Sequence, residues 1–217
     1  KIFEKFDAQS NIGESYYYIG WAHQYHTSND KGLEYYLLSF EIYEKLDDKD
    51  GIATSLNALG IGASRNSDYN KAIEFYKKAI PIVDKLEKKS FLSTLQSNIG
   101  YEYFLLRKYE LSIDYYNQSL KIVEELGDKE SVGNLKRKIG QIYEAKGDYD
   151  NSLIYSLNAL SYIEELNDTI GISNIYNGLG NNYFNIGDFK QAEKYYKDAL
   201  NIRIKFGINS YIGYAHF

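Results

Sequence analysis

The sequence has no cysteine and no methionine, a single proline and only three histidines among its 217 residues. Without cysteine, the chain can form neither a disulfide framework nor a thiolate metal site. Two histidines, His23 and His26, share a helix face, but the third, His216, is far along the chain. We therefore expect no metal site, no cofactor and no catalytic centre.

Long apolar runs and an excess of positive charge are also missing. No stretch approaches the roughly 18 to 20 apolar residues of a membrane span, so we expect no direct membrane insertion. The net charge of -5 argues against a nucleic-acid partner, because binding to phosphates needs a basic face. A composition with 44% hydrophobic and 25% charged residues is typical of a folded globular chain.

Glycine, by contrast, returns at a fixed interval. Five glycines stand forty residues apart, each after Ile or Leu: Gly20, Gly60, Gly100, Gly140 and Gly180. Apolar residues recur at three- and four-residue steps around each of them, which predicts helix. A glycine inside a helix costs about 1 kcal/mol relative to alanine, so its repetition indicates a packing role.

Other residues repeat with the same period. Twelve places after the glycines stand small residues, namely Gly32, Ala72, Ser112, Ser152 and Ala192. Sixteen places after them stand Tyr36, Tyr76, Tyr116, Ser156 and Tyr196. We expect each unit to be a pair of helices, in which the glycine of one helix faces the small residue of the other and the aromatic rings fill the space around this contact. Asp68, Asp148 and Asp188 stand where they would cap the second helix of a pair.

The fragments "LGNNYFNIGDFKQAEKYYKDAL" (179–200) and "IGQIYEAKGDYDNSLIYSLNAL" (139–160) carry this pattern most fully. They resemble the tetratricopeptide repeat, whose signature is leucine–glycine, then tyrosine, a small residue, a large aromatic residue and alanine. The second fragment departs from the signature only at Ser156. The resemblance implies an all-α, right-handed superhelical solenoid of antiparallel helix pairs. The forty-residue unit is similar to arrays of bacterial signalling proteins, among them two-component sensor kinases and peptide-pheromone receptors.

On this pattern we expect a single solenoid over residues 1–217, built of five repeats at 11–48, 51–88, 90–127, 130–167 and 170–207. Residues 1–8 fall in register with a second helix and are expected to be the tail of a preceding one. Residues 209–217 are expected to begin a sixth repeat. Both ends therefore suggest a section of a longer array, because terminal repeats normally carry a polar cap.

The resemblance also implies that the first helices line a binding groove. The groove residues expected from their offsets to the glycines are Tyr17, Trp21, Asn57, Asn98, Tyr101, Asn134, Arg137, Lys138, Asn174, Asn177 and Asn181. Asparagine is a poor helix former, so its abundance among the expected groove residues needs an explanation. Its amide offers a donor and an acceptor to the backbone of an extended peptide. The alternative is composition, because the chain uses asparagine and tyrosine freely on other faces.

Two of the groove residues, Arg137 and Lys138, are able to hold an acidic side chain or a terminal carboxylate. The functional hypothesis is a non-catalytic module that binds a protein or peptide, as the sensory or scaffolding part of a bacterial signal-transduction protein. The alternative is a receptor for a short diffusible peptide. A cysteine-free chain suits the bacterial cytoplasm and the periplasm equally, and the sequence leaves the oligomeric state open.

Overall fold

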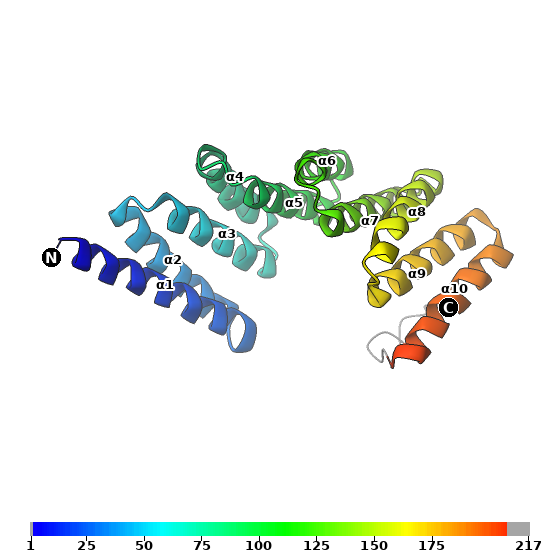
Figure 1. Cartoon of the computed structure of the whole chain (residues 1–217), viewed down its shortest axis with the longest axis horizontal. Coiled ribbons are helices and arrows are strands. Elements are labelled where there is room, and N and C mark those ends of the chain that lie inside the picture. The colour runs from blue at the N-terminus through cyan, green and yellow to red at the C-terminus, as the bar shows by residue number, and fades with distance from the viewer. Residues whose placement is uncertain (1, 208–217) are drawn as a thin grey trace. The chain divides into compact units, whose positions relative to one another are not determined.

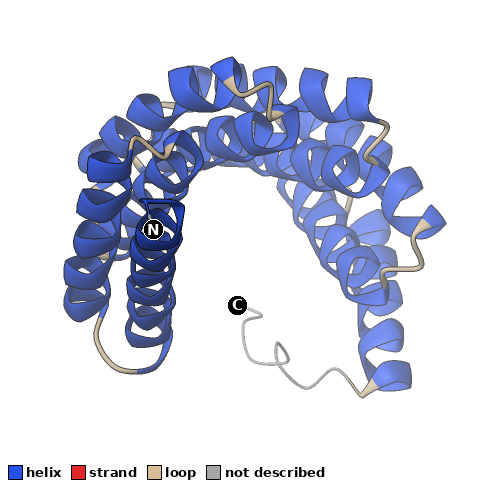
Figure 2. Cartoon of the chain, turned by 60° about the vertical axis from the view of Figure 1, so that its left-hand side comes forward, coloured by secondary structure: helices blue, strands red, loops and turns tan. Residues whose placement is uncertain are grey.

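The computed structural model describes the backbone of residues 2–207 and the side chains of residues 8–207. This part of the chain contains ten α-helices and no strand (Figure 2). In chain order (Figure 1) they are α1 (Ile2–His26), α2 (Asn29–Leu46), α3 (Lys49–Arg65), α4 (Tyr69–Lys85), α5 (Lys89–Leu105), α6 (Tyr109–Leu126), α7 (Lys129–Lys146), α8 (Tyr149–Glu165), α9 (Thr169–Ile186) and α10 (Phe189–Phe206). The expected all-α array of helix pairs is confirmed.

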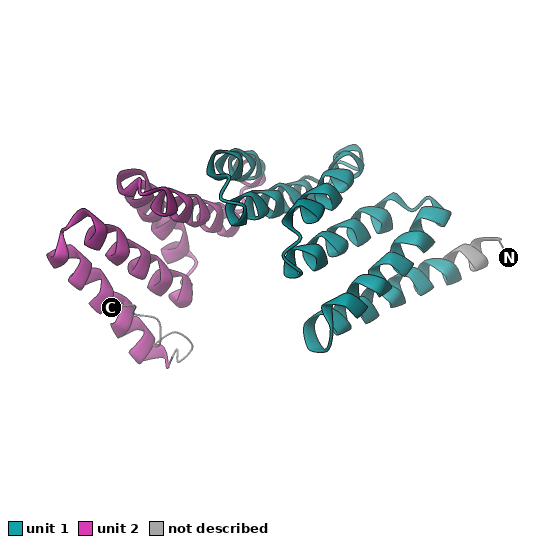
Figure 3. Ribbon diagram, turned by 180° about the vertical axis from the view of Figure 1, so that it is seen from behind, with its two compact units in different colours: residues 1–122 teal, residues 123–217 magenta. Residues whose placement is uncertain are grey.

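The chain divides into two compact units, residues 1–122 and residues 123–217 (Figure 3). In unit 1, α2 packs on α1, α3 on α2, α4 on α3 and α5 on α4, and the first helices α1 and α3 also touch. In unit 2, α8 packs on α7, α9 on α8 and α10 on α9, with a contact between α7 and α9. Within each unit the first helices of successive pairs therefore share one layer. A single solenoid over 1–217 stays a prediction.

Aspartate side chains begin most of these helices. Asp68, Asp148 and Asp188 accept hydrogen bonds from backbone amides in the first turns of α4, α8 and α10, which confirms their expected role. Asp48, Asp128 and Asp168 cap α3, α7 and α9 in the same way. Such caps satisfy amides that have no partner inside the helix.

The N-terminal boundary differs from the expectation. Residues 2–8 are not the tail of a separate helix, because α1 continues without a break from Ile2 to His26. Forty residues before the capping Asp48 the sequence has Ala8, which cannot accept a hydrogen bond from the following amides and is a good helix former. The helix therefore runs through this position. Residues 209–217, expected to begin a sixth repeat, lie outside the described part.

The periodic glycines allow close packing, and both expected neighbours, the aromatic ring and the small residue, lie against them. A Cβ on Gly60 would overlap the ring of Tyr76, and a Cβ on Gly100 would lie 3.0 Å from the ring of Tyr116. The ring sixteen places on thus covers the glycine. The small residue twelve places on faces the glycine from the second helix, as predicted: a Cβ on Gly32 would lie 2.9 Å from Gly20 O, and Ser112 Oγ donates to Gly100 O at 2.6 Å.

Candidate functional site

In unit 1, two asparagines of the expected groove are joined. Asn98 Nδ2 on α5 donates a 3.1 Å hydrogen bond to Asn57 Oδ1 on α3, and both side chains are half-buried. Among the described residues, the structure gives these two amides no other hydrogen bond. The Asn57 NH₂ group and the Asn98 carbonyl oxygen therefore remain as one donor and one acceptor on neighbouring helices, the pair that a peptide backbone needs.

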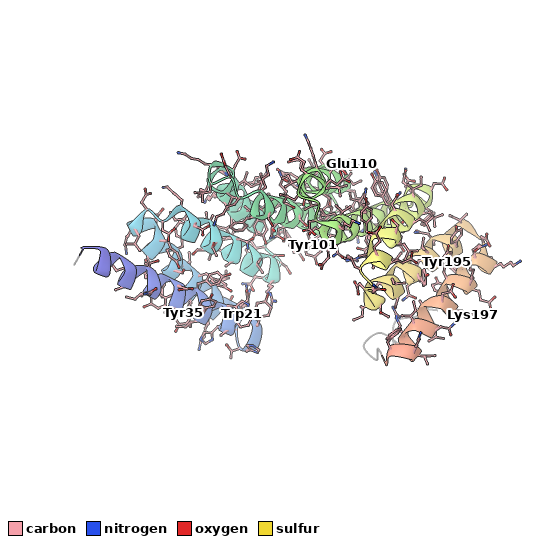
Figure 4. The ribbon with its side chains drawn as sticks, viewed as in Figure 1. Trp21, Tyr35, Tyr101, Glu110, Tyr195 and Lys197 are labelled. Carbon is pink, nitrogen blue, oxygen red and sulfur yellow. The ribbon has the colours of Figure 1, made fainter. Side chains whose placement is uncertain are left out.

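Two exposed aromatic side chains lie on first helices of the same unit, α1 and α5. Trp21 and Tyr101 are both nearly half exposed (Figure 4). The Trp21 ring lies 5.3 Å from the Tyr25 ring, centroid to centroid, and the Arg65 guanidinium lies 4.2 Å from the Tyr25 centroid. We call the set Trp21, Asn57, Asn98 and Tyr101 the unit 1 stripe. It combines two exposed aromatic rings with a hydrogen-bonded pair of amides.

Tyr17, the remaining groove residue expected in unit 1, packs against the core. Its ring is half-buried and lies 5.5 Å from the ring of Tyr36, which is one of the core residues. Burial raises the pKa of the Tyr17 hydroxyl, with the neighbouring Tyr18 and Tyr25 adding to the effect. A ring held in this way has little surface left for a ligand.

The sequence analysis missed a buried acid on α5. Glu102 on α5 is 1% exposed, and its Oε2 accepts a 3.0 Å hydrogen bond from Ser64 Oγ on α3. Burial raises the pKa of Glu102 to about 7, and the Ser64 hydrogen bond opposes this rise only in part. Because a buried charge is costly, this carboxyl gains a proton near neutral pH.

In unit 2, three of the expected groove residues lie on α7. Asn134, Arg137 and Lys138 are all half-buried. Burial lowers the pKa of the Lys138 ammonium, and the charge of Arg137 lowers it further. Arg137 and Lys138 are neighbours in the sequence of α7.

Two asparagines of α9 form hydrogen bonds with α10. Arg203 on α10 donates from Nε to Ser173 Oγ at 2.8 Å and from Nη2 to Asn174 Oδ1 at 3.3 Å. With its amide turned so that Oδ1 faces the guanidinium, Asn177 also accepts from Arg203, at 3.0 Å from Nη1. Asn174 and Asn177 thus anchor the end of α10, which sequence offsets within the first helices could not reveal.

Asn181, the last of the expected groove residues, is also engaged. Its Nδ2 donates to Glu144 Oε1 on α7 at 3.3 Å, and its Oδ1 accepts from the Tyr196 hydroxyl on α10 at 2.9 Å. Burial raises the pKa of Glu144, and the Asn181 hydrogen bond opposes that rise. In unit 2, Asn174, Asn177 and Asn181 therefore make hydrogen bonds within the fold, and α7 carries the two cations of the expected groove.

Within residues 2–207, no group of three or more His, Cys, Asp or Glu side chains is placed to hold a metal ion. None of the helices of that range is both long enough and apolar enough to cross a membrane.

A family model described as Tetratricopeptide repeat matches residues 5–85, 91–155 and 131–205. The chain belongs to the tetratricopeptide repeat family. The fold of this family generally serves as a non-catalytic scaffold for protein interaction, so the chain is a repeat module of the protein-binding kind. No curated protein matches the sequence.

Solved structures of other tetratricopeptide-like proteins share the fold. BtubC (BKLC) from P. vanneervenii is 20% identical, with a TM-score of 0.79 over 95% of this chain and 92% of its own. A Signal Transduction ATPase with Numerous Domains from Pyrococcus horikoshii is 19% identical, with a TM-score of 0.83. Aspartyl phosphate phosphatase F from Bacillus subtilis is 16% identical, with a TM-score of 0.73. This chain is covered to 90% in both of these comparisons but spans only 30% and 60% of those chains.

Proposed function

We propose that this tetratricopeptide repeat module binds an extended segment of a partner protein along its first helices. The observation that carries the proposal is the hydrogen bond between Asn57 and Asn98. It fixes one donor and one acceptor on α3 and α5, so that a peptide backbone gains both hydrogen bonds without ordering two loose side chains. This preorganisation also accounts for poor helix formers at these positions.

The aromatic rings of the unit 1 stripe supply the apolar part of the interface. Trp21 and Tyr101 expose large aromatic surfaces on α1 and α5. Tryptophan and tyrosine often contribute most to binding, because they bury much area and lose little conformational entropy. The segment we propose therefore carries apolar or aromatic side chains next to a backbone that meets Asn57 and Asn98.

In unit 2 the proposed ligand chemistry is acidic. Arg137 and Lys138 are adjacent cations on α7, and a carboxylate bound between them would offset their mutual repulsion. Such binding should weaken as salt is added, because salt screens charges over about 10 Å at 0.1 M.

The biological setting that we propose is bacterial signal transduction, with this module as its sensory or scaffolding part. Support comes from two proteins of similar fold. One is a signal transduction ATPase with a tetratricopeptide repeat sensor, and the other is an aspartyl phosphate phosphatase. A receptor for a short diffusible peptide would use the same amides. It would differ in binding the free peptide as tightly as a longer protein segment.

The proposal is tested by selecting peptides against the chain from a random display library and mapping where they lie. A photo-crosslinking residue in place of Tyr101 should capture the selected peptide. The same residue in place of Leu37, which is exposed on the second helix α2, should not. Capture at position 37 but not at position 101 would refute binding on the first helices.

A further inference from the structure

An exposed arginine of unit 1 is held in one orientation. Arg65 is the last residue of α3, and its guanidinium lies 4.2 Å from the centroid of the Tyr25 ring on α1. Its Nη1 donates a 3.3 Å hydrogen bond to the backbone oxygen of Gln24. A guanidinium has five N–H donors in a fixed plane. Among residues 8–207, the structure gives Arg65 no further hydrogen bond and no carboxylate at ion-pair distance, so donors remain for a ligand.

The backbone that accepts from Arg65 is itself fixed by a chain of hydrogen bonds. Gln24 is buried, and its Oε1 accepts from the Tyr36 hydroxyl at 3.1 Å. Its Nε2 donates to Oδ1 of Asn29, the first residue of α2, at 3.2 Å. Asn29 Nδ2 in turn donates to the Gly62 carbonyl on α3 at 2.8 Å. The ends of α1 and α3 are therefore tied together, and the guanidinium loses little conformational freedom when a ligand binds.

Two properties of the fold alone favour a positive charge at this place. The C-terminus of a helix such as α3 attracts a cation, and so does the face of the Tyr25 ring. Neither effect uses the free N–H donors. The same place holds Leu105 in the third repeat and Ala145 in the fourth, so the repeat itself does not require a cation here.

An aromatic surface adjoins the arginine. The Trp21 ring lies 5.3 Å from the Tyr25 ring, centroid to centroid, at an angle of 39°, and both side chains are about half exposed (Figure 4 labels Trp21). A ligand side chain packed on these rings would exclude water from the neighbouring guanidinium. Hydrogen bonds to a charged group strengthen where water is excluded. We call Trp21, Tyr25 and Arg65 the Arg65 site.

We propose that the Arg65 site binds a carboxylate of the extended segment, next to an apolar side chain of that segment that packs on Trp21. A planar guanidinium matches a carboxylate through two parallel N–H···O hydrogen bonds. Its charge repels a basic segment and is complementary to an acidic one. The inference rests on the proposed function, because Trp21 belongs to the unit 1 stripe, and it adds the charge of the ligand to the backbone and apolar contacts named there.

Trp21 is the single tryptophan of the chain, so its fluorescence reports on this site directly. Three probe peptides without tryptophan or tyrosine separate the possible sources of the carboxylate. Acetyl-AFEFA-amide has one acidic side chain, acetyl-AFQFA with a free C-terminus has only the terminal carboxylate, and acetyl-AFQFA-amide has neither. At least one of the two carboxylate probes should bind the parent about ten-fold more tightly than the neutral probe. The tighter of the two identifies the source.

Variants of the whole chain show whether Arg65 causes this preference. Arg65→Gln should abolish it, and Arg65→Lys, which keeps the charge without the planar pair of donors, should retain only part of it. Arg107→Gln removes the same charge from an exposed arginine that follows α5, and it should keep the full preference. Circular dichroism checks that the variants fold, which we expect because both arginines are exposed.

The inference is overturned if the neutral probe binds the parent as tightly as both carboxylate probes, or if Arg65→Gln keeps the preference. It is also overturned if no probe changes the Trp21 fluorescence. These outcomes leave the proposed function standing wherever a selected peptide still crosslinks at position 101, because that experiment depends on neither the arginine nor a carboxylate. Failure of the carboxylate site and failure of peptide binding along the first helices are thus told apart.

Discussion

The ring of Tyr76 lies directly on Gly60, with no room for a Cβ between them. In the fourth repeat the tyrosine is replaced by Ser156, and a Cβ on Gly140 would meet nothing closer than the Ser156 Oγ, at 3.1 Å. The same glycine of the motif thus has a tight environment in one repeat and a looser one in another. A comparison of the two sites therefore distinguishes the effect of packing around the glycine from the effect of its low helix propensity.

Gly60→Ala should therefore destabilise the protein by about 1 to 3 kcal/mol, because the added methyl group forces the Tyr76 ring to move. Gly140→Ala should lie within about 1 kcal/mol of the parent, since the gain in helix propensity offsets a small adjustment of Ser156. Urea unfolding followed by circular dichroism measures both. Equal losses of stability in the two variants would contradict the assignment of the tyrosine ring as the packing partner.

Glu102 should make stability depend on pH between about 4.5 and 7. Its folded-state pKa of about 7 exceeds its ordinary value of 4.5, so the folded protein holds the proton more tightly than the unfolded chain does. The stabilising effect of this proton is fully present below pH 4.5 and is lost as the pH rises through 7. The loss should amount to about 1 to 3 kcal/mol.

The variant Glu102→Gln removes this ionisation and keeps a hydrogen-bonding group for Ser64. It should be more stable than the parent at pH 8 and similar to it at pH 5, as measured by urea unfolding at the two pH values. If the parent and the variant lost the same stability between pH 5 and pH 8, Glu102 would not be the group responsible.

Asn182 on α9 is completely buried, and its Nδ2 donates to Ser152 Oγ at 2.8 Å. Its Oδ1 has no hydrogen-bond partner among the described residues. The corresponding residue of the preceding repeat is the buried Ile142. Asn182→Ile should therefore stabilise the protein by about 1 kcal/mol, because an unsatisfied buried acceptor is removed. If the variant had a lower thermal midpoint than the parent, the Asn182 amide would be stabilising the fold and the prediction would be wrong.

Much of the fold follows from periodic residues. The forty-residue spacing of glycine, tyrosine and the capping aspartates predicts paired helices, because each of these residues acts through neighbours on its own helix or the next. The site is less predictable. Offsets along the first helices predict one stripe that includes Asn57 and Asn98, whose amides are hydrogen-bonded to each other, but they cannot show that Arg203, on a second helix, binds Asn174 and Asn177. Glu102 was missed for a similar reason: the same place in other repeats holds Gly62 or Ile142, so its burial depends on tertiary packing.

The central claim is that Asn57 and Asn98 bind the backbone of an extended segment. Its most direct test measures the dissociation constant of a peptide selected against the chain, for Asn57→Ala/Asn98→Ala and for the matched pair Asn70→Ala/Asn117→Ala on the exposed sides of α4 and α6. Two lost hydrogen bonds of about 0.5 to 1.5 kcal/mol each should raise the dissociation constant of the first variant by about five-fold to a hundred-fold. The second variant should bind like the parent. If instead the two double variants bound the peptide equally well, the asparagines of the first helices would reflect composition alone and the claim would be wrong.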